Sequence, residues 1–371
     1  MKNIKIIANY LPQYHVIPEN DKWWGKGFTD WVAVKKTVQL YPDHNQPRVP
    51  LGNHYYSLDD ADEIKWQAEL AKKYNIYGFG IYHYWFSSEL HLLDKPAELI
   101  LANQDIDMHY MFIWDNVSWI RTWKNIRNAN AWAPKFDGET NGQDDGVLAE
   151  LKYGNKDDWR NHFLYLLKFF KDERYIKIDN KPMFGIFKPE NNNKTIKEII
   201  KYWNKLALEH GFDGIFCITR ENWKYKDDGY QMKYAPFNVN SFLGGVRIKL
   251  RGWCIKYFNR INIYDYDALW QGILNDAKKS SAKIFLSGFV DYDDTPRRGR
   301  FAKIVRGSTP KKFYYYMRKL LEISKQQGKE YVFLTAWNEW GEGAYLEPDK
   351  TNGYAYLEAL KNAVDKVNLD A

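Results

Sequence analysis

Near its amino terminus the chain reads IKIIANYLPQYH, from Ile4 to His15, an apolar strand pattern that runs directly into polar and aromatic residues. The first strand of an open nucleotide-binding sheet is followed by a glycine-rich phosphate turn of the form G-x-G-x-x-G. No such turn follows here, because Leu11, Pro12 and Gln13 occupy that place. The stretch therefore favours a closed parallel barrel over a nucleotide-binding sheet.

The rest of the chain repeats this strand pattern at regular intervals, with helical segments in between. The eight candidate strands are Ile4–Tyr10, Tyr77–Tyr84, His109–Trp114, Pro182–Phe187, Gly214–Thr219, Met232–Phe237, Lys283–Phe289 and Tyr331–Trp337. Short apolar runs that alternate with helices indicate βα units. Eight such units predict an α/β fold, a single (β/α)₈ TIM barrel over residues 1–371.

The expected helices carry the usual end signals. They cover Leu58–Tyr74, Asp158–Phe170, Thr195–His210, a segment from Thr309, and Tyr354–Val367. The first opens with acidic residues and closes with Lys72 and Lys73, as the helix dipole prefers. Long segments follow the first strand (Leu11–Ser57) and the third (Asp115–Asp157). Barrel enzymes build their sites from loops after strands, so these two are expected to wall a cleft.

Composition narrows the class of protein. Of the 371 residues, 45% are apolar and 27% charged, and the basic residues behind the net charge of +7 are scattered rather than gathered. Scattered charge argues against a nucleic-acid groove. Cys217 and Cys254 are the two cysteines, too few for a disulfide framework. Neither a secretory signal nor a bilayer-spanning apolar run is visible, so a cytoplasmic protein without membrane span is expected.

Aromatic content is high, with 16 Trp, 28 Tyr and 20 Phe, or 17% of the chain. Rings beside polar groups at strand ends can stack on the faces of sugars. Trp24, Trp85 and Trp119 are the best placed, and we expect them to be partly accessible on a cleft wall. An oligosaccharide or polysaccharide is therefore the expected partner.

The strongest chemical signal follows the eighth strand, where Asn338-Glu339-Trp340-Gly341-Glu342-Gly343 begins. Two carboxylates three residues apart emerge together at the face where barrel enzymes place their sites. Glycosyl chemistry needs one protonatable carboxyl at the leaving oxygen and a second that acts as nucleophile or base. We therefore predict Glu339 and Glu342 as catalytic residues, with Asn338 beside them at the substrate. The alternative is a structural role, in which one glutamate lies at the start of a helix and the other is an ordinary surface residue.

A second constellation follows the seventh strand, in Asp291-Tyr292-Asp293-Asp294-Thr295-Pro296-Arg297. Asp291 and Asp293 are predicted to orient sugar hydroxyls, and Arg297 to pair with a carboxylate or phosphate. A rival interpretation takes Asp291 and Asp293 as a D-x-D metal site of a nucleotide-sugar transferase. The chain lacks the nucleotide-binding organisation that such a site requires, so we predict neither metal nor cofactor. A solvated turn is the remaining alternative.

Polar and aromatic side chains also follow the other strands. The further candidates for substrate binding are Tyr14, His15, His83, Tyr84, Trp85, Trp114, Asp115, Asn116, Trp119 and Glu221. Each group mixes rings with hydrogen-bonding side chains, which suits a pocket for hydroxyl groups. A lone histidine in such a place is more often structural than catalytic. Zinc spacing, a G-x-S-x-G elbow and a P-loop are all missing from the sequence.

These motifs closely resemble the WbsX-like family, glycosyltransferases assigned to bacterial surface-polysaccharide clusters and related to the endo-α-mannosidase family of glycoside hydrolases. The resemblance covers nearly the whole chain and rests on Tyr10–His15, Trp23–Trp31, Gly78–Phe86, Asp293–Arg297 and Trp337–Pro348. It implies a (β/α)₈ barrel and assigns roles to the glutamates. Glu339 would assist the sugar 2-hydroxyl in its attack on the anomeric carbon, and Glu342 would serve as acid and then base.

Two departures from the family pattern concern the substrate. Where such proteins read Trp-Ala-Asn-Glu-Asn-Trp, this chain reads Trp114-Asp115-Asn116-Val117-Ser118-Trp119, so Val117 replaces a carboxylate. The turn usually led by Trp-Asp-Asn is Tyr292-Asp293-Asp294 here. These changes bear on the identity of the sugar and on the presence of a helper carboxylate.

Three functions remain open from the sequence. The leading one is a retaining, endo-type glycoside hydrolase or lyase-like enzyme. The second is a glycosyltransferase in surface-polysaccharide biosynthesis, which would need an activated donor. The third is a glycan-binding module without catalysis, which has no need of two glutamates on one short turn.

Overall fold

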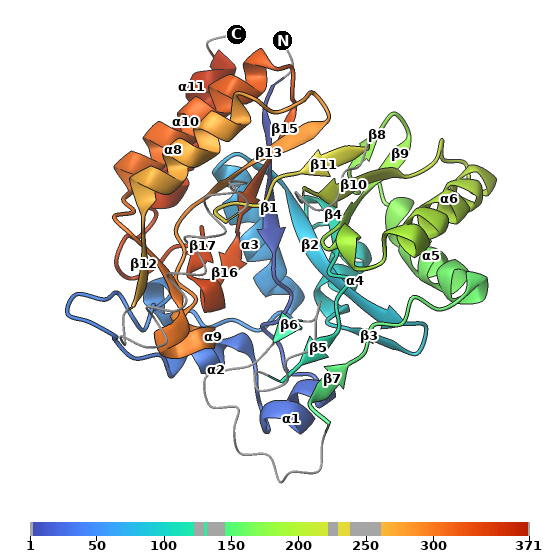
Figure 1. The fold of residues 1–371 in the computed structure, drawn as a ribbon, viewed down its shortest axis with the longest axis horizontal. Helices are drawn as coiled ribbons and strands as arrows, with labels where there is room; N and C mark the ends of the chain where they lie inside the picture. Colours follow the sequence, from blue (N-terminus) through green and yellow to red (C-terminus); the bar gives the residue numbers. More distant parts are fainter. Residues whose placement is uncertain (1–2, 122–129, 132–144, 222–228, 238–260, 370–371) are drawn as a thin grey trace. The chain divides into compact units, whose positions relative to one another are not determined.

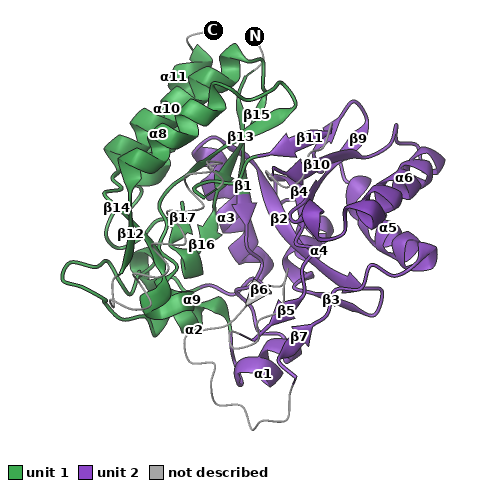
Figure 2. Ribbon diagram, in the orientation of Figure 1, with its two compact units in different colours: residues 1–8, 29–55, 233–371 green, residues 9–28, 56–232 purple. Residues whose placement is uncertain are grey.

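The computed structural model describes residues 3–121, 130–131, 145–221, 229–237 and 261–369 (Figure 1). The chain divides into two compact units, coloured separately in Figure 2. Unit 1 comprises residues 1–8, 29–55 and 233–371, and unit 2 comprises residues 9–28 and 56–232. That residues 1–371 act as a single domain stays a prediction.

Eight parallel strands carry the fold, close to the predicted ranges. They are β1 (Lys5–Tyr10), β2 (Ile76–Ser87), β4 (His109–Trp114), β9 (Lys181–Ile186), β10 (Phe216–Arg220), β11 (Tyr230–Met232), β13 (Ile284–Phe289) and β15 (Tyr331–Thr335). The longer helices between and after them are α3 (Ala61–Lys73), α4 (Lys95–Ala102), α5 (Lys156–Phe170), α6 (Asn193–Glu209), α8 (Tyr266–Ala277), α10 (Pro310–Gln326) and α11 (Ala355–Leu369). This alternation is the predicted (β/α)₈ barrel.

In unit 1, β15 pairs in parallel with β1 on one side and with β13 on the other, so Val332 lies opposite both Ile6 and Leu286. Helices α8, α10 and α11 pack together beside these strands (Figure 1). Gly288 of β13 permits this packing, because a Cβ there would lie 2.5 Å from the sulfur of Met317 and 2.9 Å from Trp270. A larger residue would push α10 and α8 away from the sheet.

Unit 2 holds the parallel ladder β2-β4-β9-β10-β11. Strand β2 continues into an antiparallel hairpin with β3 (Leu90–Leu92). Strands β2, β4 and β9 are almost entirely buried, which is why they read as continuous apolar runs rather than as alternating patterns. Side chains cap two of the helices: Asp60 accepts from the backbone of Asp62 at α3, and Asn155 begins α5 with a capping box.

The sixth strand corrects the prediction. Expected at Met232–Phe237, it is β11, Tyr230–Met232, although the backbone nitrogen of Lys233 still donates to the carbonyl of Phe285 at 3.0 Å. Pro236 keeps the strand from running through the rest of the expected range, because proline has no amide hydrogen to donate to a neighbouring strand. The structure also adds α8, whose first turn is capped by Asp265 through the backbone of Ala268. Within the described ranges, none of the helices combines the length and apolarity that crossing a membrane would require.

Candidate active site

The turn after β15 folds back on itself within unit 1. Its elements are β16 (Asn338–Glu339), a 3₁₀ turn at Trp340–Glu342, and β17 (Ala344–Tyr345), which pairs antiparallel with β16. Trp340 anchors the turn: its ring stacks on Tyr345 with centroids 3.6 Å apart, and its indole nitrogen donates to Glu347 at 2.6 Å. The tryptophan between the two glutamates is therefore a buried support.

Gly343 ends the 3₁₀ turn in the left-handed region, with φ of +58°. A Cβ at this position would lie 3.0 Å from the backbone nitrogen of Asp293 and 3.1 Å from Cζ of Arg48. Both the conformation and the close approach thus call for glycine. The turn is pressed against the loop that follows β13.

Arg297 joins the two predicted catalytic glutamates. It lies on α9 (Thr295–Arg298), and its Nη1 is 2.8 Å from Glu342 Oε1 while its Nη2 is 3.2 Å from Glu339 Oε2. Nη2 is also 3.3 Å from Asp30 of α2 (Asp30–Lys35). One guanidinium therefore serves three carboxylates. The side chains of Asp30 and Glu339 are 6% and 5% exposed, whereas that of Glu342 is 23% exposed, so Glu342 is the one that faces outward.

The pKa of Glu339 is raised to about 8, mainly by burial, with Arg297 lowering it and the charges of Glu342 and Asp30 adding to the rise. The physical reason is that three buried negative charges around one positive charge are unfavourable, so one carboxyl retains a proton. A pKa close to neutrality suits a group that exchanges protons during a reaction. Glu339 is thus a carboxyl of the cluster that can exchange a proton near neutral pH.

A second cluster of polar side chains surrounds Asp293. His44 Nε2 and Gln46 Nε2 each lie 2.8 Å from its carboxylate. Burial alone would raise the pKa of Asp293, but these bonds and the charge of Arg48 hold it below its usual value. The backbone nitrogen of Asp293 donates to the carbonyl of Glu342 at 2.6 Å. This loop therefore supports the turn that carries the glutamates.

Arg48 completes this cluster. It donates through Nη2 to Asp291 at 2.9 Å and through Nη1 to the carbonyl of Gly343 at 3.2 Å. Burial raises the pKa of Asp291 in spite of that pairing. Since Asp291 and Asp293 already hold Arg48 and His44, a metal ion would have to displace protein partners to use them. The structure thus gives the two predicted aspartates protein partners.

Reasoning from the sequence missed four of these residues: Asp30, His44, Gln46 and Arg48. All four come from the long segment after the first strand, which was expected to wall a cleft. Asp30 also lies inside the quoted motif Trp23–Trp31, so the signal was present without an assigned partner. Asn338 was predicted at the substrate, and the structure places it fully buried in β16.

In unit 2, His83 and Trp85 lie in a closed aromatic cluster. His83 Nε2 is 2.8 Å from His162 Nε2, and both imidazoles are buried. The Trp85 ring stacks on His162 at 4.4 Å and 2°, and on His91 at 4.8 Å and 5°. The expectation that Trp85 is accessible is therefore wrong: it is 6% exposed, because histidines of the protein occupy its stacking surface.

The expected accessibility is also wrong for Trp119. It is 1% exposed, with Tyr84 and Phe86 edge-on against its ring at 4.9 and 5.4 Å. Trp24 is half-buried, as predicted, and Arg121 lies over its ring at 5.0 Å. Of the three rings expected on a cleft wall, Trp24 alone has the expected accessibility.

The remaining candidates of unit 2 are mostly buried in hydrogen-bonded or packed positions. Trp114 donates to the carbonyl of Trp85 at 2.9 Å, and the amide of Asn116 both donates to the carbonyl of Lys188 and accepts from its nitrogen, each at 2.8 Å. Asn116 thus ties two loops together. Four of the other candidates are buried, namely Tyr14, His15, Tyr84 and Asp115, and Glu221 is half-exposed. Val117, which replaces the usual carboxylate, is 1% exposed.

Comparison with known proteins agrees with this architecture. The family model described as Glycosyltransferase WbsX matches residues 6–360. The uncharacterized protein WxcX of Xanthomonas campestris pv. campestris, in strain B100 and in a second strain, is 25% identical over 371 residues, covering 97% of this chain and 50% of the relative. The chain thus spans about half the length of the curated relatives it matches.

Solved structures show the same fold. A GH99 endo-α-mannosidase from Bacteroides thetaiotaomicron, in complex with Bis-Tris propane, aligns with a TM-score of 0.55 at 14% identity over 100% of both chains. A glycoside hydrolase-like protein aligns with a TM-score of 0.56 at 12% identity, over 98% of this chain and 94% of its own. At these identities the likeness concerns the fold, which is the (β/α)₈ barrel.

Proposed function

This chain belongs to the WbsX glycosyltransferase family, and we propose that it is a carbohydrate-active enzyme that cleaves glycosidic bonds in a polysaccharide or glycan. One observation carries the proposal: Glu339 and Glu342, on one short turn, share the guanidinium of Arg297 at 3.2 and 2.8 Å. Glycosyl chemistry requires two carboxyls with different protonation states. Here the deeply buried Glu339 has a raised pKa while Glu342 is more exposed and forms the shorter ion pair.

The division of labour that we propose follows the resemblance. Glu339 draws the proton from the sugar 2-hydroxyl while that oxygen displaces the leaving group at the anomeric carbon, and Glu342 protonates the leaving oxygen. Glu342 then takes a proton from water, which opens the resulting 1,2-anhydro sugar while Glu339 returns the proton to the 2-oxygen. The two inversions retain the anomeric configuration. A base with a pKa near 8 is strong enough to take a hydroxyl proton and is still partly ionised near neutrality. Arg297 stabilises the ionised forms of both carboxyls, and Asp30 holds the other side of Nη2.

A glycosyltransferase is the second candidate, favoured by the name of the family. It would use the same carboxyls on an activated donor, with a sugar hydroxyl instead of water as acceptor. The curated relatives are about twice as long as the matched region, so in those proteins a part outside this region is available to contribute to the activity. A binding module without catalysis is the weakest alternative, since binding alone does not require a carboxyl held near neutral pKa.

The deciding experiment compares donors. In one arm the purified chain is incubated with a panel of aryl α- and β-glycosides and surface-polysaccharide fragments without nucleotide. In the other arm it is incubated with nucleotide sugars, and product release is measured in both. Hydrolysis that Glu339→Gln abolishes on every substrate, and that Glu342→Gln abolishes on the polysaccharide fragments, supports the hydrolase. Turnover only with nucleotide sugars, abolished by the same variants, supports the transferase. Activity that both variants retain would refute the proposed site.

A further inference from the structure

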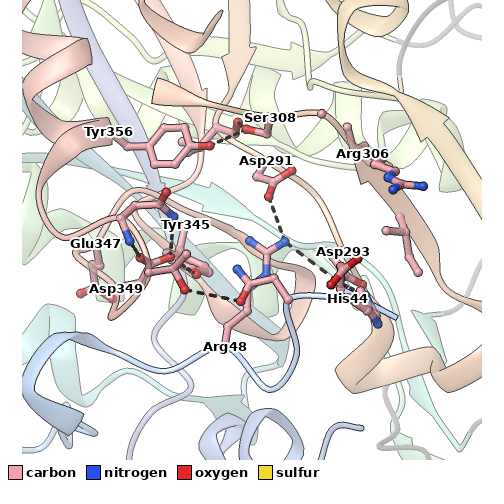
Figure 3. A pocket seen from close by; sticks show the side chains of 18 of the residues that line it. His44, Arg48, Asp291, Asp293, Arg306, Ser308, Tyr345, Glu347, Asp349 and Tyr356 are labelled. Carbon is pink, nitrogen blue, oxygen red and sulfur yellow. Dashed lines mark hydrogen bonds and ion pairs between the residues drawn. The ribbon is translucent and has the colours of Figure 1, made fainter. Parts of the chain in front are cut away.

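A cavity of about 270 Å³ opens in unit 1 beside the turn that carries the glutamates (Figure 3). Its wall is formed by the loop at residues 41–48, the segment 290–293 after β13, the segment 304–308 and the segment 345–356. Glu339 and Glu342 are not part of the wall. Asp291 and Asp293 are, so the second constellation singled out in the sequence lines this cavity rather than the Arg297 cluster.

The charged groups of the wall are largely compensated by the protein itself. Arg48 pairs with Asp291 at 2.9 Å, as Figure 3 shows, and His44 with Asp293 at 2.8 Å. Asp349 accepts from the hydroxyl of Tyr345 at 2.8 Å. The wall therefore presents these charged groups as hydrogen-bond donors and acceptors in fixed orientations.

Two hydroxyls of this wall form a hydrogen-bonded pair. Ser308 Oγ and Tyr356 Oη lie 2.7 Å apart, and Ser308 Oγ also donates to the carbonyl of Val290 at 3.2 Å. When Ser308 donates to Val290 it accepts from Tyr356, and the tyrosine oxygen keeps a lone pair. The pair can therefore accept a hydrogen bond from a ligand hydroxyl.

The lining also selects the class of ligand. Five carboxylates (Asp43, Asp291, Asp293, Glu347 and Asp349) and two guanidiniums (Arg48 and Arg306) face it, an excess of negative charge that disfavours phosphate or an acidic sugar. Paired charges and hydroxyls disfavour a lipid or an aromatic ligand. The volume lies just below the ~300–1,000 Å³ typical of drug-sized ligands, which leaves room for about one sugar ring.

We propose that this cavity is a second carbohydrate subsite, which holds one neutral pyranose unit through hydroxyl contacts to the Ser308–Tyr356 pair and to the carboxylates of the wall. The proposal rests on the proposed function in taking the ligand to be part of a glycan. Arg48 also donates to the carbonyl of Gly343, and Asp293 to that of Glu342. A sugar in the cavity therefore contacts residues that hold the catalytic turn, and it anchors an extended glycan away from the bond that is cleaved.

The test is direct binding, measured by isothermal titration calorimetry on the full chain. The probes are the methyl pyranosides of glucose, mannose and galactose, with glucuronate, glucosamine and inorganic phosphate as the charged comparisons. Thr351→Trp blocks the cavity from an exposed lining position, and Lys350→Trp places the same ring on the exposed neighbour that does not line it. We expect millimolar binding of at least one neutral pyranoside, weakened at least tenfold in Thr351→Trp and less than twofold in Lys350→Trp.

Three results would overturn the subsite: no neutral pyranoside binds, a charged probe binds more tightly than all of them, or Thr351→Trp binds as the wild type does. Binding is also measured in Glu339→Gln, which separates this proposal from the previous one. Pyranoside binding that persists in Glu339→Gln and is lost in Thr351→Trp supports the subsite even if the chain shows no turnover. Turnover that Glu339→Gln abolishes and Thr351→Trp leaves with unchanged KM supports the catalytic pair and refutes the subsite.

Discussion

The Arg297 cluster of unit 1 and the His83–Trp85–His162 cluster of unit 2 make an instructive pair. The first lies after strands β13 and β15, the second lies on the second half of β2 and on α5, and each buries titratable side chains. In the first, burial raises the pKa of Glu339 to about 8. In the second, burial lowers the pKa of His83 to about 4 and that of His162 well below its usual value. Burial acts in the same sense in both, because it favours whichever form is neutral.

The difference lies in the partners. Glu339 contacts a guanidinium that partly compensates its negative charge, and this contact keeps the pKa of the carboxyl close to neutral pH. His83 contacts another imidazole and aromatic rings, and the more distant Asp94 does not offset the cost of burial. A buried titratable group is thus a catalytic candidate when a charged partner returns its pKa towards neutrality. Without such a partner, the same burial makes a neutral structural core.

The largest expected effect is on turnover in unit 1. Glu339→Gln and Glu342→Gln keep shape and hydrogen bonding but remove titration, so each should lower kcat by at least ~10²-fold on a natural glycan. With an activated aryl leaving group, Glu342→Gln should retain much of its first-step rate, because little protonation is needed, while Glu339→Gln should not. His83→Gln, the matched change in unit 2, should alter stability more than kcat. Steady-state kinetics on both substrates decide the comparison, and near wild-type rates in both glutamate variants would contradict it.

The next effect concerns stability. Arg297→Ala leaves Asp30, Glu339 and Glu342 without their shared cation, and breaking such a buried pairing should cost about 3 kcal/mol of unfolding free energy at neutral pH. Urea unfolding measures it. Arg300→Ala, on the exposed neighbouring turn, should change stability by less than about 0.5 kcal/mol. Equal losses in the two variants would show that the guanidinium does not compensate the carboxylates.

The histidine cluster predicts acid sensitivity. The pKa of His83 is near 4 in the folded chain and 6.5 as its ordinary value, so between these pH values the unfolded chain binds a proton that the folded chain refuses. The contribution to stability is complete above pH 6.5 and declines as pH falls towards 4, by up to roughly 3 kcal/mol. Urea midpoints at successive pH values measure it. His83→Phe should flatten this decline, whereas His210→Gln, at an exposed position, should leave it unchanged; an unaltered decline in His83→Phe would be evidence against the assignment.

The pH dependence of kcat/KM distinguishes the roles of the glutamates. A base must be ionised, so with Glu339 as base and its pKa raised to about 8, kcat/KM should rise about tenfold per pH unit below that value and level off above it. Glu339→Gln should lose this limb. If kcat/KM instead falls as pH rises through 8, Glu339 acts as the acid, and the order of roles that the resemblance implies is reversed.

The smallest expected effect compares two glycines. Gly343 and Gly353 both lie in the left-handed region, with φ of +58° and +56°, so alanine at either position should cost about 1 kcal/mol. A Cβ at Gly343 would also press on Asp293 and Arg48, whereas nothing lies within 4 Å at Gly353. Gly343→Ala should therefore lose about 1 kcal/mol more and lower turnover, as thermal unfolding and kinetics can measure. Equal behaviour of the two variants would mean that the turn tolerates displacement of Arg48.

Several features of the protein followed from the sequence alone. Apolar strand runs and helix caps are local, so their order along the chain predicted the (β/α)₈ barrel, and strand boundaries agreed to within a few residues except at β11, which ends at Met232. The position of Glu339 and Glu342 also followed locally, because a residue just after a parallel strand must emerge at the strand's carboxyl end. Arg297 was predicted as a substrate contact that pairs with a carboxylate or phosphate, and the structure pairs it with the protein's own Glu339 and Glu342.

The tertiary structure alone decided which side chains meet. Asp30 lies 267 positions from Arg297, and His44 lies 249 from Asp293, distances over which no periodicity in the sequence can be read. Accessibility was equally hidden: Trp24, Trp85 and Trp119 have similar surroundings in the sequence, yet two of them are buried by rings from elsewhere in the chain. Partners, burial and therefore pKa depend on long-range packing, because each is a property of the neighbours in space rather than of the residue itself.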